Sequence, residues 1–394
     1  MLTCNYSRNI PLFKGFIVKN FLENSSGFYE VYLEMPKTIH RCPYCGYSTS
    51  YVKDYRIQII KDTKIGGKDL FIHLRKRRYI CNHCRRSFTE LNPLVKRYQH
   101  FSSRFYTQTY QEFQSVQSFK AIANRFGVSV TSIIRWFDKI NYGTPELPDC
   151  FSIDEFKGNA NNEKFQCNVT DPVKHKVLDI LPKRNIESLC SHFLQYSIQD
   201  RKQVKNVVMD LSTTFRSAIN ILFPNAKIIA DKFHVIRLVT WSMEGVRKRI
   251  QKQFHKQRRR WFKRSKKILM APEAKLSIED KSVLNQMLTA SHELEQAHIL
   301  KERFYSIFKA KTQFEAKNEL QNWFFLAEQF NLPEFKHCIT TFTKWSDEIT
   351  RIVEHKVSNG YTEGVNNKIK VLKRISFGVR NFNRFRNRIL YLCS

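Results

Sequence analysis

The sequence predicts a multidomain protein of mixed α+β and α/β structure with a metal-bound segment near its N-terminus. Two Cys-x-x-Cys pairs lie within residues 36–90, and from Cys150 the residue pattern gives the order β-β-β-α-β-α-β. A highly charged helical stretch follows to about residue 356. With 394 residues, 42% of them hydrophobic, the chain is long enough for two or three domains with cores of their own.

The two cysteine pairs are the strongest local motif. Cys42 and Cys45 are separated from Cys81 and Cys84 by 35 residues. Two such knuckles present four thiolates, which Zn²⁺ binds tetrahedrally. The segment holds few large apolar side chains, so a structural zinc would stabilise it. The long separation fits a zinc ribbon with an elaborated hairpin, and a redox or unliganded role is the alternative.

A helix-turn-helix is predicted at Phe119–Trp136, which reads FKAIANRFGVSVTSIIRW. Ser118 and Ser129 can cap its two helices, and Gly127 suits a turn with positive φ. The exposed start of the second helix would then reach base edges in a major groove. The residues predicted for this contact are Val130, Thr131, Ser132 and Arg135. An ordinary αα-hairpin is the alternative.

Acidic residues at strand ends are conspicuous in so basic a chain. Asp154 follows apolar residues in the first strand of the sheet, and Asp210 ends the buried fourth strand. The first and fourth strands of a β-β-β-α-β sheet are neighbours, so the two carboxylates can face each other and repel unless divalent cations hold them. A third acid should come from a helix, and Glu363 stands just inside a helix start. Asp231 and Glu155 are rivals, although Glu155 should point to the opposite sheet face.

The formal net charge is +32, from 67 lysine and arginine residues against 35 acidic residues. Twelve basic residues and no acid fall within Val246–Lys267, and eight more fall between Gly364 and the C-terminus. Such blocks favour nucleic acid, because neutralising phosphates releases condensed counterions. The residues of these blocks predicted to contact it are Arg258, Arg259, Arg260, Lys368, Lys370, Lys373 and Arg374.

Targeting signals are not evident. No stretch approaches the roughly 20 apolar residues of a membrane span. The first 14 residues show neither a basic region followed by an apolar run nor a small-residue cleavage site. We therefore expect a cytoplasmic, nucleoid-associated protein with reduced cysteines and no membrane partner.

Several motifs together resemble the ISL-three family of bacterial insertion-sequence transposases over nearly the whole chain. They are the cysteine quartet, the helix-turn-helix, Ser152-Ile-Asp154-Glu-Phe, Val208-Met-Asp210-Leu-Ser, Ala230-Asp-Lys-Phe-His234 and Asn359-Gly-Tyr-Thr-Glu363-Gly-Val-Asn-Asn. The resemblance implies an RNase H-like catalytic domain interrupted by a helical insertion. It also implies a DDE triad of Asp154, Asp210 and Glu363 that holds two Mg²⁺ or Mn²⁺ ions, with Asp231 and His234 shaping the site where the insertion departs.

The activity that this resemblance implies is metal-dependent cleavage and strand transfer at transposon ends. The partner would be double-stranded DNA, both as terminal repeats and as target, and we expect a homo-oligomer assembled on it. Two alternatives stay open. One is a DNA-binding regulator with an inactive domain, and the other is an RNase H-like nuclease without strand transfer.

The expected domains follow from these motifs in chain order. They are a zinc ribbon (1–95), a helix-turn-helix domain (96–145), the first part of the catalytic core (146–236), a basic helical insertion (237–356) and the last helix of the core with a basic tail (357–394).

Overall fold

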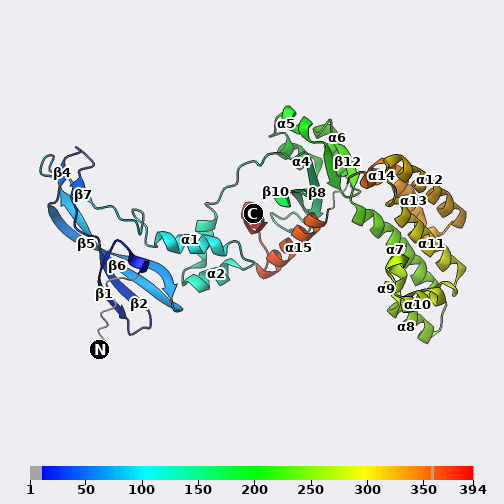
Figure 1. Ribbon diagram of the computed structural model, residues 1–394, viewed down its shortest axis with the longest axis horizontal. Coiled ribbons are helices and arrows are strands. Elements are labelled where there is room, and N and C mark those ends of the chain that lie inside the picture. Colours follow the sequence, from blue (N-terminus) through cyan, green and yellow to red (C-terminus); the bar gives the residue numbers. More distant parts are fainter. Residues whose placement is uncertain (1–10, 356–358, 394) are drawn as a thin grey trace. The chain divides into compact units, whose positions relative to one another are not determined.

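The computed structural model describes residues 11–355 and 359–393, and the chain divides into two compact units, Met1–Asn141 and Tyr142–Ser394 (Figure 1). Each unit contains its own sheet and its own helices, which confirms the predicted multidomain architecture of mixed α and β structure. Within the described ranges, no helix is long and apolar enough to cross a membrane.

The first unit is built on a sheet with the strand order β1-β2-β6-β5, in which β7 also pairs with β6, and on a small β3-β4 ribbon. The strands are β1 (Ile17–Glu23), β2 (Tyr29–Glu34), β3 (His40–Arg41), β4 (Ser48–Thr49), β5 (Val52–Ile65), β6 (Lys68–Ile80) and β7 (Ser87–Thr89). The long β5-β6 hairpin turns at Gly66 and Gly67, whose φ angles of 57° and 82° favour glycine.

The first unit has an apolar core of its own. Val31, Ile60 and Ile72 are fully buried within one cluster on the sheet, next to the short 3-10 helix η2 (Pro11–Phe13). The expectation that this region holds too few large apolar side chains was therefore wrong. Alternate residues of β2 and β6 are apolar, and this period-2 pattern supplies the core that a simple count overlooked.

Three helices follow the sheet within the first unit: α1 (Ser103–Glu112), α2 (Phe119–Phe126) and α3 (Val130–Phe137). The hydroxyl oxygens of Ser118 and Ser129 accept hydrogen bonds from the backbone N–H groups of Ala121 and Ser132, so each serine caps its helix as expected. Gly127 ends α2 with a φ of 60°. The predicted helix-turn-helix geometry is confirmed.

The second unit contains a five-stranded sheet with the order β10-β9-β8-β11-β12. Its strands are β8 (Cys150–Phe156), β9 (Gln166–Asp171), β10 (Lys176–Leu181), β11 (Asn206–Met209) and β12 (Lys227–Ala230). The first three strands form the antiparallel meander that the sequence predicts, whereas β8, β11 and β12 pair in parallel. The first and fourth strands are neighbours, as predicted.

Helices cover both faces of this sheet, because side chains alternate along each strand. Phe151 and Ile153 are buried in one cluster with α4 (Ile186–Phe193) and α6 (Thr213–Leu222). Phe156 is buried in a second cluster with α15 (Gly360–Ile375) and α16 (Phe382–Cys393) (Figure 1).

A helical insertion separates β12 from α15. Its elements are α7 (Lys232–Gln251), α8 (Lys256–Arg264), α9 (Lys266–Met270), η3 (Glu273–Lys275), α10 (Ile278–Leu288), α11 (His292–Ile307), α12 (Gln313–Phe330), η4 (Pro333–Phe335), α13 (Lys336–Lys344), α14 (Ser346–Thr350) and η5 (Arg351–Val353). The side chain of Asp231 caps α7 by accepting a hydrogen bond from the backbone N–H of Phe233.

Two helical expectations need correction. The single helix predicted between the third and fourth strands is in fact two helices: α4 ends at Phe193, and α5 (Ile198–Gln203) begins anew because Ser197 and Asp200 form a capping box. The expected basic tail contains α16, whose Phe385 and Ile389 are fully buried. The three arginines of α16, Arg384, Arg386 and Arg388, disguised its apolar stripe.

Candidate functional site

The four cysteines converge at one place in the first unit. Their sulfur atoms all lie within 4.8 Å of one another, with Cys42 Sγ 3.6 Å from Cys84 Sγ and Cys45 Sγ 3.5 Å from Cys81 Sγ. Tetrahedral zinc with Zn–S bonds of about 2.3 Å requires sulfur separations of roughly 3.8 Å, so the quartet fits a structural zinc ion.

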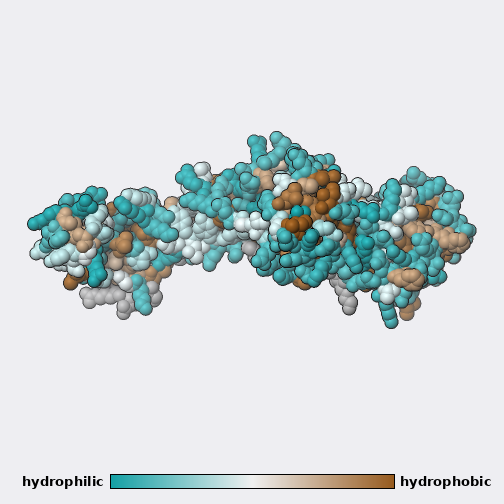
Figure 2. Space-filling model, turned by 90° about the horizontal axis from the view of Figure 1, so that it is seen from above, coloured by the Kyte–Doolittle hydropathy of each residue, from teal (hydrophilic) through white to brown (hydrophobic). Residues whose placement is uncertain are grey.

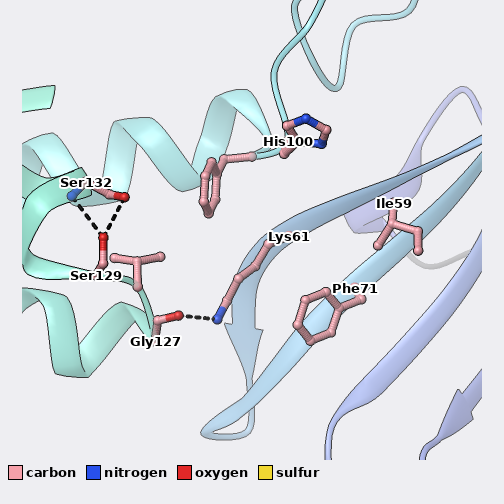
Figure 3. Close-up of a pocket in the computed structure, with 9 residues that line it drawn as sticks. Ile59, Lys61, Phe71, His100, Gly127, Ser129 and Ser132 are labelled. Atoms are coloured by element: carbon pink, nitrogen blue, oxygen red, sulfur yellow. Dashed lines mark hydrogen bonds between the residues drawn. The ribbon is translucent and has the colours of Figure 1, made fainter. Parts of the chain in front are cut away.

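The turn of the helix-turn-helix is fixed by a lysine from β5. Lys61 Nζ donates a hydrogen bond to the carbonyl oxygen of Gly127 at 2.8 Å (Figure 3). The same Nζ atom pairs with Asp69 at 3.0 Å. A Cβ atom at position 127 would lie 2.7 Å from that Nζ atom. Glycine is therefore required here both for its positive φ and for the close approach of the lysine.

The predicted recognition face of α3 is largely accessible. Val130, Thr131 and Arg135 are exposed. Ser132 is half-buried, and its hydroxyl lies 2.9 Å from that of Ser129, so it is less accessible than expected. Ser132 takes part in the cap of α3, and its side chain therefore lies toward the turn.

The acidic site lies at the carboxyl ends of three adjacent parallel strands in the second unit. Ile153 of β8 is opposite Met209 of β11, so the residues that follow, Asp154 and Asp210, emerge side by side. Met209 is in turn opposite Ala230 of β12, and Asp231 follows it. The parallel register thus brings the predicted pair together and adds Asp231 next to it.

Burial disfavours the charged forms of the first two carboxylates. It raises the pKa of Asp154 to about 6, against the opposing effect of His234, and the neighbouring carboxylates Asp210 and Asp231 raise it further. Burial likewise raises the pKa of Asp210 to about 6. Asp210 Oδ1 is buried without a hydrogen-bond partner among the described residues. These two carboxylates therefore have unsatisfied affinity for positive charge.

Asp231 differs from both of its neighbours. Burial raises the pKa of its carboxyl, but a 2.7 Å contact with His234 Nδ1 outweighs this effect and the net pKa is lowered. The same carboxylate accepts a hydrogen bond from Asn359 Nδ2 at 3.2 Å. Because these partners occupy it, Asp231 is less available to a metal ion than Asp210, whose Oδ1 atom has no hydrogen-bond partner among the described residues.

Helix α15 contacts the acidic site through residues that the sequence analysis did not single out. Asn366 Nδ2 donates a 2.8 Å hydrogen bond to Asp154 Oδ2, and its Oδ1 atom accepts one from Asn168 Nδ2 at 3.3 Å. The hydroxyls of Thr362 and Thr170 lie 2.7 Å apart. The only available signal was the position of Asn366 three residues after Glu363, which places both on one helical face.

Glu363 lies in the first turn of α15, as expected, and its side chain is exposed. In the described part of the chain, the four cysteines form the only group of three or more metal-binding side chains gathered closely around one point. Glu363 therefore lies on the helix that covers Asp154, but its carboxylate does not pack against those of Asp154 and Asp210. Glu155 pairs with Arg184, and its negative charge is close enough to help raise the pKa of Asp210.

The predicted basic contacts are mostly accessible, and hydrophilic residues cover most of the face seen in Figure 2. Arg258, Arg259 and Arg260 are exposed on α8, and the exposed residues of α15 include Lys368, Lys370 and Arg374. Lys373 is half-buried, because its Nζ atom donates a 2.6 Å hydrogen bond to the carbonyl oxygen of Lys157. That lysine attaches α15 to the loop after β8.

A zinc ribbon, a helix-turn-helix and an acid-bearing α/β domain together define a DNA transposase. Residues 151–389 match a family described as transposase, residues 39–84 match the zinc-finger of transposase IS204/IS1001/IS1096/IS1165, and residues 90–141 match the helix-turn-helix domain of transposase family ISL3. The chain belongs to the ISL3 family of insertion-sequence transposases.

Similar proteins agree with this assignment. The chain is 24% identical to the transposase for insertion sequence element IS1001 of Bordetella parapertussis over 364 residues, which cover 90% of this chain and 89% of the relative. It is 23% identical to the transposase for insertion sequence element IS1557 of Mycobacterium tuberculosis over 45% of each chain. A further match, 39% identical over 66 residues to an ATP-dependent protease of Lactococcus lactis, covers only 16% of the chain.

Zinc content provides a direct test of the cysteine site. Cys42→Ser or Cys81→Ser should lower bound zinc from about one ion per chain to a small fraction of that, because each sulfur is one of only four ligands. Elemental analysis of the purified full chain measures this loss. Cys190→Ser, a half-buried cysteine of the second unit, should retain the zinc. Wild-type protein without zinc would contradict the assignment.

The raised pKa of Asp210 predicts how stability depends on pH. Between the ordinary carboxyl pKa of 3.8 and the folded value of about 6, the folded chain binds more protons than the unfolded chain, so this group's contribution falls as pH rises. Asp210→Asn should therefore stabilise the metal-free protein by about 1–2 kcal/mol above this window and have little effect below it.

Chemical denaturation in buffer without added Mg²⁺ or Mn²⁺ measures this difference, since a chelator would also remove the zinc of the first unit. The exposed Asp149 provides the matched control, and Asp149→Asn should change the free energy of unfolding by less than about 0.5 kcal/mol at either pH. A loss of stability in Asp210→Asn above the window would show that the carboxylate makes favourable contacts in the absence of metal.

Proposed function

We propose that this transposase binds the terminal repeats of its insertion sequence and catalyses divalent-metal-dependent DNA cleavage and strand transfer. The observation that carries the proposal is a pair of carboxylates, buried Asp154 and half-buried Asp210, side by side where the parallel pairing of β8 with β11 ends, both with raised pKa values. Two such groups repel each other unless cations are bound, and the affinity of carboxylates for Mg²⁺ or Mn²⁺ meets that need.

Asp154, Asp210 and Glu363 would hold two ions, as a DDE triad does. The unpartnered, buried Oδ1 atom of Asp210 supports this fit, because it retains free ligand capacity. Bound divalent ions would polarise the scissile phosphate and activate the attacking water or 3′-hydroxyl. Hydrolysis would expose a 3′-hydroxyl at the transposon end, and attack by that hydroxyl on a target phosphate would join the strands.

The remaining residues of the site would position these ligands. Asn366 would orient the Asp154 carboxylate through its 2.8 Å hydrogen bond to Oδ2, while the backbone N–H of Glu155 donates to Oδ1 at 2.8 Å. Asp231 would hold His234 by the 2.7 Å contact, and the raised pKa of His234, to which this contact contributes, favours a positive charge beside Asp154. That charge would favour the ionised carboxylates that metal binding requires.

DNA would be bound by two kinds of surface. The start of α3 would read the terminal repeat through Val130, Thr131, Ser132 and Arg135. The basic residues of α8 and α15 would contact phosphates, which position the duplex without reading its sequence. In this scheme the domain divisions at residues 95, 145, 236 and 356 separate end recognition from chemistry, and the protein works as a homo-oligomer on nucleoid DNA.

Substitution of the three acids tests the catalytic proposal. Asp154→Ala, Asp210→Ala and Glu363→Ala should each reduce cleavage by at least about a thousandfold, because neither ion can be positioned with a ligand missing. Cleavage of a supercoiled plasmid that carries the terminal repeats, with and without Mg²⁺, is the measurement. Binding to the same DNA should persist, which separates lost chemistry from lost folding.

Several variants sharpen this experiment. Glu155→Ala, next to Asp154 in sequence but paired with Arg184, should keep its cleavage activity. Asp231→Ala and His234→Ala should give intermediate rates. Full cleavage by Glu363→Ala would assign the third ligand elsewhere, with Asp231 as the first replacement. Full cleavage by Asp154→Ala would remove the basis of the DDE proposal.

Arg135 tests the proposed recognition face. Arg135→Ala should weaken binding to the terminal repeat by about 1–3 kcal/mol and leave binding to random DNA nearly unchanged, because contacts to base edges carry the specificity. Fluorescence anisotropy at fixed salt measures both affinities. The exposed Arg303 on α11 is the control, and Arg303→Ala should alter neither. An equal loss on both DNAs would assign Arg135 to a phosphate contact.

A further inference from the structure

Strand β5 is an edge of the sheet in the first unit and carries a row of exposed apolar side chains. The strand order β1-β2-β6-β5 leaves β5 with β6 as its neighbour on one side. Tyr55, Ile57 and Ile59 are 48%, 65% and 53% exposed. Natural sheets protect such edges with short strands, prolines or charges. β5 has 14 residues and no proline, and although it carries charged residues such as Lys53 and Arg56, its three exposed apolar residues in alternation indicate a partner.

The backbone of these same residues is open to pairing. Lys61 N–H donates to the carbonyl oxygen of His100 at 2.8 Å, and Lys61 C=O accepts from Ser102 N–H at 3.0 Å, so both backbone groups of Lys61 point away from β6. Backbone direction alternates along a strand in an antiparallel pair. Tyr55, Ile57 and Ile59 are two, four and six residues from Lys61 in an unbroken register, so their backbone groups also point away from β6.

We propose that this edge pairs with β5 of a second copy of the chain, antiparallel and with Ile57 on the two-fold axis. In this register Ile57 faces Ile57 of the partner, and Tyr55 faces Ile59 at both ends of the pairing. Apolar side chains then meet at all three open positions and Arg56 meets Gln58, while Lys53 faces Lys61, whose ammonium group is paired with Asp69. A register centred on Tyr55 would instead set Lys53 against Ile57.

A second copy explains this edge better than DNA does, because the basic side chains of the hairpin are largely paired. Arg78 lies 2.7 Å from Asp54, and Arg75 lies 3.3 Å from Glu34 and stacks on the ring of Tyr55 at 3.8 Å. Arg77 is buried against Glu90. The distinctive property of this edge is its apolar row and open backbone rather than free positive charge.

Such pairing would join two helix-turn-helix segments through one continuous sheet. Within each first unit, the Lys61–Gly127 hydrogen bond attaches the turn after α2 to β5, so α3 is linked to the paired strand (Figure 3). Two-fold pairing would therefore present two recognition helices with a fixed relation, as dimeric DNA-binding proteins do. This interface is independent of the acidic site and of the proposed chemistry.

Self-association of the full chain tests the proposal. Sedimentation velocity over a concentration series should show a reversible dimer in the wild type, and Ile57→Arg should weaken it by roughly tenfold or more, because it opposes two charges on the axis. Ile278→Arg, at an isoleucine that is 87% exposed in the second unit, is the matched control and should associate like the wild type. Unchanged zinc content in Ile57→Arg would show that its first unit remains folded.

Crosslinking provides a second measurement that does not require the protein to tolerate an arginine at position 57. Ile57→Cys should be joined between copies by a short bismaleimide, whereas wild type and Ile278→Cys, which share the native cysteines, should stay at background. A wild-type monomer at all concentrations, an unchanged dimer in Ile57→Arg, or background crosslinking of Ile57→Cys would each overturn the proposal. Weakened DNA binding by Ile57→Arg with unchanged association would assign the edge to DNA.

Discussion

The parallel pairing of β8 with β11 is the constraint on which the acidic site depends. It sets Asp154 and Asp210 at neighbouring strand ends, where burial raises the pKa of both carboxyls. Neighbouring residues offset this negative charge. His234, held by Asp231, contributes positive character, and Asn366 donates a hydrogen bond to Asp154. The basic helices add a surplus of positive charge outside the site, and such a surplus suits a polyanionic partner.

The two units meet different physical demands. The first must hold the turn of a helix-turn-helix steady on a sheet, and it does so with an apolar core, a cysteine quartet and the Lys61–Gly127 hydrogen bond. The second must keep two like charges close together, and it does so by packing helices on both faces of one sheet. The two units thus rest on separate sets of stabilising contacts.

The strand ends and cysteine knuckles could be predicted because each has a local signature. Asp154 and Asp210 follow apolar runs, and the parallel order then makes them neighbours. Asn366 could not be predicted in the same way, because an asparagine in a helix looks like any solvated polar residue until the strand opposite it is known. The full lengths of β5 and β6 could not be predicted, because charged residues interrupt their apolar alternation. Helix α16 was missed because arginines outnumber the aromatic residues that it buries.

The order of elements along the chain has a consequence for synthesis. Helices α15 and α16 cover one face of the sheet in the second unit, yet they follow the whole helical insertion in sequence. While a ribosome is still translating the insertion, Phe156 and Ile180 on that face lack their cover, and Asp154 lacks its hydrogen bond from Asn366. The acidic site thus matures late in translation, and chains broken off earlier would expose an apolar face to chaperones and proteases.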